Sequence, residues 1–213
     1  MKPVVAIDGP AGSGKGTLAR MIASHFNFAY LDTGLLYRIV AFLNVSLEKV
    51  KGMHVKEFLD IAVKLTDEQL RSPENSAKAS NIAKIPKIRE IMTYLQRDFI
   101  DMYRDRGIVL DGRDIGSVVV PDACCKLFVT ADLEERAKRR FADLNNKKMT
   151  FAEVYDSMKL RDVQDKTRKV APLTCDETYV VVDTTGQSVQ ESFKICKEEV
   201  KRAFINSEYK SFV

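Results

Sequence analysis

The sequence has little of what several classes of protein need. Among 213 residues it has two histidines, His25 and His54, which we expect to be surface or packing residues. It has four cysteines and no Cys-x-x-Cys spacing, so neither a zinc site nor a disulfide framework is indicated, and we expect reduced thiols. The cysteines are Cys124, Cys125, Cys175 and Cys196.

An excess of charge of one sign and long apolar runs are also lacking. The 34 basic and 30 acidic residues leave a formal net charge of +4, with no basic stripe of the kind that binds nucleic acid. No run approaches the ~18–20 apolar residues that span a bilayer. We expect no secretory signal, because no apolar stretch before Val4 leads to a cleavage site. We therefore expect a soluble, cytoplasmic protein that binds neither nucleic acid nor membrane.

A glycine-rich segment follows that first run, Val4 to Ile7. It reads Gly9-Pro10-Ala11-Gly12-Ser13-Gly14-Lys15-Gly16-Thr17, and apolar residues at helical spacing come next. Glycines let several backbone N–H groups point at one anion, and the start of the following helix adds partial positive charge. Lys15 can reach the β- and γ-phosphates of a nucleoside triphosphate, and the hydroxyl of Thr17 can ligate Mg²⁺. The segment therefore predicts a triphosphate site, and its Gly-Lys-Gly-Thr form resembles that of nucleoside-monophosphate kinases.

Four further apolar runs alternate with helical patterns, which predicts an α/β fold with a five-stranded parallel sheet covered on both faces. The runs are Phe28–Leu31, Gly107–Asp111, Lys126–Val129 and Tyr179–Asp183. Thr33 follows the first of these and is expected to cap the next helix. Asp111 ends the second, where an acid beside a phosphate loop can hold Mg²⁺ or its water shell.

The remaining segments are helical and highly charged. Residues 44–80 show no strand alternation and predict a compact helical insertion, after which Pro86 opens a long helix. Three pairs have capping-box spacing: Asp132 with Glu135, Thr150 with Glu153, and Ser188 with Glu191.

Two groups of arginines leave alternatives open. Arg136, Arg139 and Arg140 share a helix face whose simplest interpretation is solvated surface. Arg161, Asp165 and Arg168 stand at i, i+4 and i+7, so they form either an exposed salt-bridge ladder or a stripe that closes on a transferring phosphate.

Taken together, the motifs resemble the bacterial cytidylate kinases, and the match runs nearly end to end. The blocks that carry it are Ile7 to Thr17, Leu31-Asp32-Thr33-Gly34 with Tyr37-Arg38, Asp111 to Gly116, Val119 to Ala123, Glu134 to Ala137, and Arg161-Asp162 leading to Val170-Ala171-Pro172-Leu173. Gln164 departs from the pattern, because it stands where the lid of relatives has a second arginine. The helical insertion is also shorter than in many relatives.

The resemblance implies Mg²⁺-assisted transfer of a phosphoryl group from ATP to CMP or dCMP. It implies that the CMP site consists of Thr33, Arg38, Ser80, Arg89, Arg113, Asp114, Asp165 and Arg168. It implies that Lys15, Arg161 and Arg168 act in transfer, that Thr17 and Asp111 serve the metal, and that Arg136 packs on the adenine of ATP, with residues 9–17 around its phosphates.

The resemblance also implies one kinase domain over residues 1–213, which we expect to act as a monomer. Its core would comprise residues 1–43, 86–144 and 170–213, its monophosphate-binding insert about 44–85, and its lid about 145–169. Three alternatives remain open: a kinase for UMP or another small acceptor, a nucleotide-binding switch that hydrolyses ATP slowly, and a nucleic-acid-binding module.

Overall fold

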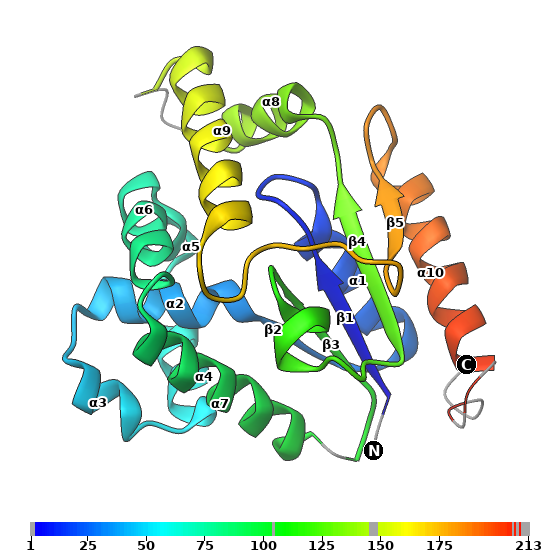
Figure 1. Ribbon diagram of the computed structural model, residues 1–213, viewed down its shortest axis with the longest axis horizontal. Coiled ribbons are helices and arrows are strands. Elements are labelled where there is room, and N and C mark those ends of the chain that lie inside the picture. Colours follow the sequence, from blue (N-terminus) through cyan, green and yellow to red (C-terminus); the bar gives the residue numbers. More distant parts are fainter. Residues whose placement is uncertain (1–2, 104, 145–148, 206, 208, 210–213) are drawn as a thin grey trace. The chain divides into compact units, whose positions relative to one another are not determined.

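The computed structural model of the chain describes residues 3–103, 105–144, 149–205, 207 and 209. Its strands are β1 (Val4–Asp8), β2 (Ala29–Asp32), β3 (Ile108–Gly112), β4 (Cys125–Thr130) and β5 (Val180–Asp183). Within the described residues these form one five-stranded sheet in the order β2, β3, β1, β4, β5 (Figure 1). The strand β1 pairs in parallel with β3 and β4, and β4 pairs in parallel with β5. The predicted α/β fold with a parallel sheet is confirmed.

The helices that follow the strands have these bounds. They are α1 (Lys15–Phe26), α2 (Thr33–Leu43), α3 (Leu47–Lys51), α4 (Val55–Lys64), α5 (Asp67–Arg71), α6 (Pro73–Ile82), α7 (Pro86–Met102), the π-helix η1 (Ile115–Val119), α8 (Leu133–Asp143), α9 (Phe151–Thr167) and α10 (Val189–Ile205). In the part of the chain that the structure describes, no helix is long and apolar enough to cross a bilayer.

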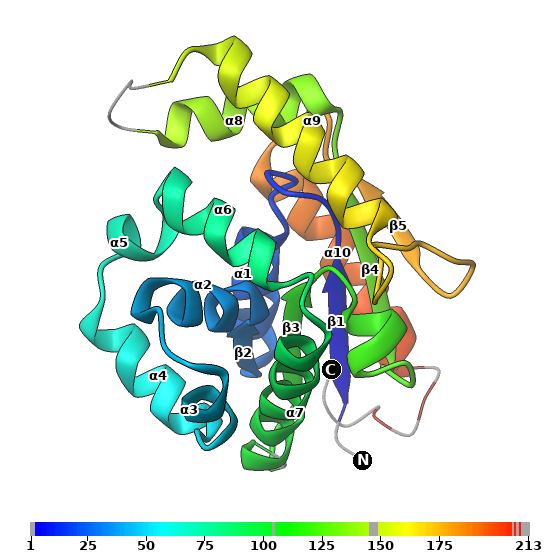
Figure 2. The same cartoon turned by 60° about the vertical axis from the view of Figure 1, so that its left-hand side comes forward.

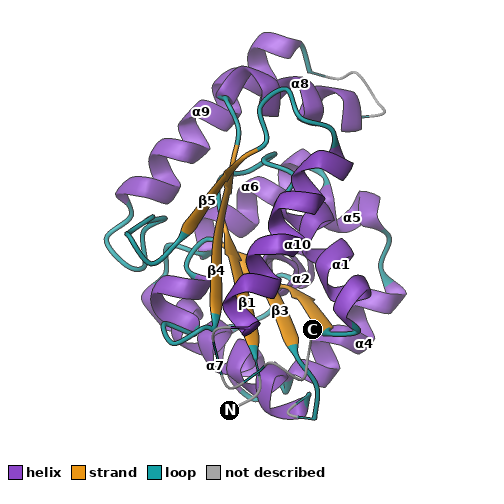
Figure 3. Ribbon diagram, turned by 90° about the vertical axis from the view of Figure 1, so that its right-hand side faces the viewer, coloured by secondary structure: helices purple, strands orange, loops and turns teal. Residues whose placement is uncertain are grey.

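The chain divides into two compact units. The first comprises Met1–Tyr30 with Arg106–Val213, and the second comprises Leu31–Asp105. The core of the first unit lies where α1 and α10 pack together and cover one face of the sheet (Figure 3). Val5, Ile7, Ile22, Leu127 and Phe204 are fully or almost fully buried there. Burial of these side chains fixes the sheet, so the loops after β1, β3 and β4 leave from the same edge.

The second unit is helical from α2 to α7. Leu36, Ile39, Phe58, Met92 and Leu95 are fully buried in it, which accounts for their helical spacing in the sequence. No strand occurs among its residues 33–103, all of which are described, so the predicted helical character of residues 44–80 is confirmed.

The predicted helix starts have mixed outcomes. Pro86 is the first residue of α7, and the capping boxes of Thr150 with Glu153 and Ser188 with Glu191 form. The prediction for Thr33 is wrong, because α2 begins at Thr33 itself and extended Asp32 takes the N-cap position.

The capping box of Asp132 with Glu135 does not form either. Asp132 makes no side-chain cap, and its backbone N–H donates to the hydroxyl of Thr185. Glu135 instead accepts from Arg139, one turn further along α8. The donor and the acceptor of one hydrogen bond of the box, the Asp132 N–H and the Glu135 carboxylate, thus each have another partner, and the Asp132 side chain does not form the other.

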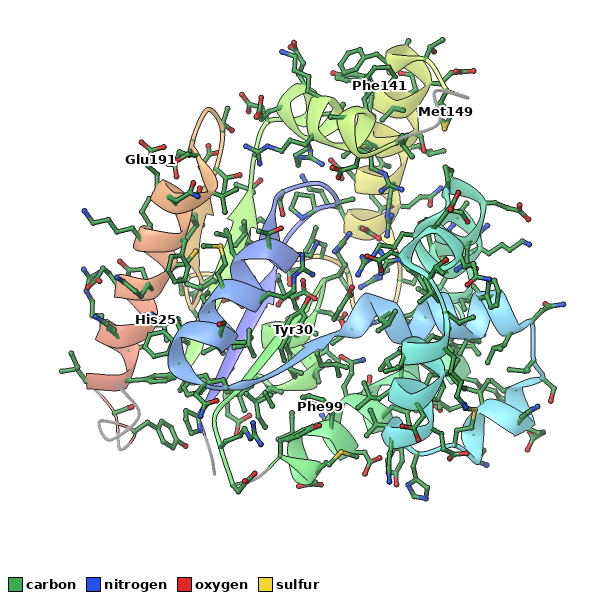
Figure 4. The ribbon with its side chains drawn as sticks, turned by 180° about the vertical axis from the view of Figure 1, so that it is seen from behind. His25, Tyr30, Phe99, Phe141, Met149 and Glu191 are labelled. Atoms are coloured by element: carbon green, nitrogen blue, oxygen red, sulfur yellow. The ribbon has the colours of Figure 1, made fainter. Side chains whose placement is uncertain are left out.

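The helices α8 and α9 lie side by side in the first unit (Figure 2). Ala137 of α8 packs with Val154 and Met158 of α9, and Phe141 and Met149 add partly buried surface at the same pair (Figure 4). The α8–α9 pair therefore has a small apolar core of its own.

Candidate active site

The glycine-rich segment forms a tight loop between β1 and α1. Gly9 and Gly12 have φ values of 151° and 75°, which residues with a Cβ rarely adopt. A Cβ on Gly9 would overlap the carbonyl oxygen of Val129 in β4, so only glycine lets the chain leave β1 here. The ammonium of Lys15 donates to the carbonyl oxygen of Pro10 at 3.3 Å, which folds this cation back over the loop. The loop thus combines a cation with the start of a helix, as a polyphosphate site requires.

One carboxylate and one hydroxyl near the loop suit a magnesium ion. Asp111, near the end of β3, is buried, and its Oδ2 lies 3.1 Å from the place that a Cβ on Gly16 would take. Thr17 follows Gly16 directly and is exposed. Mg²⁺ takes oxygen ligands, and usually only one or two from the protein when phosphates and water supply the rest. The carboxylate of Asp111 and the hydroxyl of Thr17 are oxygen ligands of this kind, so the residues present fit the ion.

Two charged pairs join the segment after β3 to the end of α9. Arg113 donates through Nε to Oδ2 of Asp165 at 2.8 Å, and Nη2 of Arg168 lies 3.5 Å from Oδ1 of Asp114. Nε of Arg161 lies 4.0 Å from the same Oδ2 of Asp165. Burial alone would raise the pKa of Asp165, yet the guanidiniums of Arg113, Arg161 and Arg168 hold it below its usual range. These five predicted site residues therefore form one cluster.

The arrangement of this cluster differs from the predicted helical stripe. Asp165 is only 7% exposed, so the alternative of an exposed salt-bridge ladder is wrong. Arg168 lies beyond the last turn of α9, with φ −61° and ψ 141°, and its Nε donates to the carbonyl oxygen of Ala171. Its position therefore depends on the loop after α9, which helical periodicity does not describe.

Arg136 is buried at the base of the α8–α9 pair. Its Nη1 and Nη2 donate to the two carboxylate oxygens of Asp162 in α9 at 3.1 and 2.6 Å. Its remaining donors reach the carbonyl oxygens of Ala131, at 2.7 Å, and of Ala11 in the glycine loop, at 3.1 Å. Solvated surface is therefore wrong for this arginine, which ties α8 to α9 and to the loop.

A buried acid that sequence reasoning left without a role lies at the end of β1. Asp8 accepts hydrogen bonds from the backbone N–H groups of Ile115 and Gly116 at 2.9 and 2.8 Å, and from the hydroxyl of Tyr179 at 2.8 Å. Burial raises the pKa of Asp8, although these three donors favour its ionised form. Asp8 thus joins three segments that are far apart in the chain.

The second unit holds the other predicted acceptor-site residues. Thr33 begins α2 and is buried, and Ser80 is half-buried on α6. Nη1 of Arg38 lies 3.7 Å from Oδ2 of Asp32. The guanidinium of Arg89 is buried, lies 5.9 Å from the centroid of the Tyr37 ring, and donates to the carbonyl oxygen of Ala83. In this unit Arg38 is therefore held by Asp32, and Arg89 is held by Tyr37 and Ala83.

Arg71 is a further cation of the second unit that the sequence did not single out. Its Nη2 donates to Oδ2 of Asp32 at 2.7 Å, the oxygen nearest to Arg38. Burial opposes the charge of Arg71, but Asp32 and Asp67 outweigh burial and raise its pKa. Asp32 therefore stands between two guanidiniums.

Comparison with known proteins identifies the family. A family model described as cytidylate kinase matches residues 5–202. The chain belongs to the cytidylate kinase family. It is 44% identical over 199 residues to the cytidylate kinase of Methylocella silvestris, with 90% of each chain covered. It is 43% identical over 203 residues to that of Cereibacter sphaeroides strain KD131, with 94% of this chain and 96% of the relative covered.

Two solved structures share the fold of this cytidylate kinase family member at low identity. An uncharacterized protein from Eubacterium ventriosum has a TM-score of 0.58 at 17% identity, with 95% of this chain and 99% of that chain covered. TT1252 from Thermus thermophilus has a TM-score of 0.53 at 18% identity, with 93% and 96% covered. These likenesses concern the fold alone.

Some residues that organise the site of this cytidylate kinase family member carried only a weak signal in its sequence. Asp8 ends a buried strand directly before the glycine loop, where an acid is expensive unless it is hydrogen-bonded, and that position could have identified it. Asp162 belongs to the Arg161-Asp162 block that carries the resemblance, but nothing in the pattern indicated a role of its own. Tyr179 and Arg71 had no distinguishing pattern, because their partners come from distant segments.

Proposed function

We propose that this protein transfers the γ-phosphoryl group of ATP to CMP and dCMP, forming ADP and CDP or dCDP. The observation that carries the proposal is the cluster that joins Arg113 and Asp114, after β3, to Asp165 and Arg168 at the end of α9. That segment leaves the sheet at the same edge as the glycine loop, since β1 and β3 are parallel neighbours. Membership of the cytidylate kinase family supports the same reaction.

The donor nucleotide is proposed to bind at the glycine loop. Residues 9–17 would surround its phosphates, Lys15 would neutralise their charge, and Arg136 would pack on adenine. Thr17 and Asp111 would hold Mg²⁺ partly through water, and the ion would screen the phosphate charges when bound. The approach of Asp111 to Gly16 supports this metal position.

The acceptor is proposed to bind through the predicted CMP residues. The exocyclic amine of cytosine can donate a hydrogen bond to a carboxylate, and the ring acceptors of cytosine can accept hydrogen bonds from a guanidinium. Asp114 and Arg113 therefore have the required chemistry. Ser80 would lie near the base, Asp165 would bind the sugar, and Thr33 would complete the site. Arg38, Arg89 and Arg168 would receive the monophosphate.

The chemistry needs charge neutralisation more than a base. The attacking oxygen of CMP is already anionic at neutral pH, so no residue has to remove a proton from it. Two polyanions must approach each other, and Lys15, Arg161 and Arg168 would offset that repulsion and stabilise the transferring phosphoryl group. This explains why the residues proposed to act in the transfer step are cations and include no histidine.

We propose the domain division into a core, an insert over about 44–85 and a lid over about 145–169, whose closure would exclude water. Residues 145–148 lie outside the described part of the chain. The protein is proposed to act as a monomer in the cytoplasm.

An ADP-release assay with ATP and Mg²⁺ tests the proposal, with CMP, dCMP, UMP, AMP and GMP supplied one at a time. We expect CMP and dCMP to give the fastest release over a control without acceptor. Equal rates with UMP would favour the broader pyrimidine kinase. No stimulation by any acceptor would favour the nucleotide switch and refute the proposal.

Two variants test the roles of single residues. Lys15→Ala should lower turnover by about 10³-fold or more, because it removes a cation from the transferring phosphates. Arg113→Met should mainly raise the KM for CMP. Arg202→Met, on the exposed side of α10, is the matched control and should match the wild type. Turnover within about tenfold of wild type for Lys15→Ala would contradict its assignment.

A further inference from the structure

The Asp8 carboxylate binds the first backbone donors of η1. Ile115 and Gly116 each direct an N–H at a different oxygen of Asp8, and the hydroxyl of Tyr179 shares Oδ2 with Gly116. A carboxylate has enough lone pairs for three donors, whereas an amide would place its NH₂ group against one of them. The geometry at this point therefore requires an acid.

The contact affects Arg113 and Asp114, because these two residues directly precede Ile115 and Gly116, whose N–H groups Asp8 binds. Asp114 has φ −147° and ψ 26°, and its carbonyl oxygen accepts from Val118 and Val119 in the wide turn of a π-helix. π-helical turns are rare, and they often occur at functional sites. Hydrogen bonds that fix the start of η1 therefore also fix the backbone of Asp114, which immediately precedes it.

Tyr179 closes the cluster from the segment before β5. A Cβ on Gly116 would lie 2.7 Å from its hydroxyl oxygen, so the phenol rests directly on the backbone of η1. Burial alone would lower the pKa of Arg113, yet the charges of Asp165, Asp111 and Asp8 raise it. Asp8 thus acts on the Arg113 and Asp114 segment through both hydrogen bonds and charge.

We infer that Asp8, supported by Tyr179, is a positioning residue that orients Arg113 and Asp114 toward the acceptor base. It does so from the end of β1, the strand that leads into the phosphate loop. The inference rests on the proposed function, in which these two residues recognise cytosine. It makes Asp8 the structural link between acceptor recognition and the donor loop, since Gly9 follows it directly.

The test combines kinetics with hydrogen exchange on Asp8→Asn and Tyr179→Phe. Losing one hydrogen bond to a charged group should raise the KM for CMP about tenfold in Tyr179→Phe. Asp8→Asn, which disturbs all three hydrogen bonds of the carboxylate, should raise it further. The KM for ATP should stay within about twofold in Tyr179→Phe, which leaves Asp8 charged. Amide exchange in residues 112–120 should become faster in both variants. Tyr94→Phe, which alters an exposed phenol, is the matched control.

Two results would overturn the inference. Unchanged exchange at residues 112–120 would show that Asp8 does not anchor η1. Equal increases in the KM for ATP and for CMP, in Tyr179→Phe, would show a general structural role. If Asp8→Asn does not fold, Tyr179→Phe still decides the matter. A wild-type protein without CMP-dependent ADP release would refute the proposed function, and the exchange result would still decide whether Asp8 is an anchor.

Discussion

The buried pair of Arg136 and Asp162 allows a stability prediction from the geometry. Its side chains are 6% and 15% exposed, and two hydrogen bonds of 3.1 and 2.6 Å join them. Replacing Asp162 with Ala leaves the guanidinium of Arg136 buried without its carboxylate. We expect this variant to unfold more easily than the wild type.

The magnitude follows from how much of the environment of Arg136 remains. Breaking a buried ion pair costs about 3–5 kcal/mol when one charge stays behind. Arg136 keeps its hydrogen bonds to the carbonyl oxygens of Ala131 and Ala11, so the lower end applies. About 3 kcal/mol corresponds to a fall in Tm of about 6–12 °C for a chain of this size. Replacing both partners, as in Arg136→Met with Asp162→Leu, should cost less than the sum of the two single replacements, because each single variant leaves one charge buried without its partner.

Urea unfolding followed by far-UV circular dichroism measures these free energies, and it suits a chain that contains no tryptophan. Glu134→Ala is the matched control, because it breaks an exposed pair with Lys138 on the same α8 helix and should leave stability within error. A loss below about 1 kcal/mol in Asp162→Ala, or losses that simply add in the double variant, would refute the reasoning.

Two further predictions follow from the fold. Gly9→Ala should abolish folding or lower Tm far more than Gly186→Ala, whose positive φ costs about 1 kcal/mol but whose Cβ would meet open space; equal losses would contradict the overlap with β4. Iodoacetamide at pH 8 should label exposed Cys175 in the folded protein, and Cys125 and Cys196 only in urea, since burial raises the pKa of Cys196 to about 12. Peptide mass mapping checks this, and rapid native labelling of all three would count against it.

The sequence predicted the elements whose signals are local. Apolar runs identified every strand of the described sheet. The runs of β1 and β3 are continuous because both strands are fully buried, whereas β5 keeps its run of valines although Val180 and Val181 are exposed. The glycine loop and the capping box of Thr150 with Glu153 were also evident, since each depends on residues within a few positions of one another.

Local patterns failed where another partner, near or far in the chain, competed with them. The box of Asp132 with Glu135 does not form because Thr185 and Arg139 occupy these groups instead. Helical spacing placed Arg168 on the stripe of α9, but the helix ends before it.

The sequence by itself therefore determined the order of strands and helices, the phosphate loop and the chemical types available for the site. Only the tertiary structure decided which charges meet. Asp8 and Tyr179 are 171 positions apart, and Arg113 and Asp165 are 52 apart. Such pairs leave no periodic signal, because a buried charge finds its partner through the packing of the sheet and helices that carry the two residues.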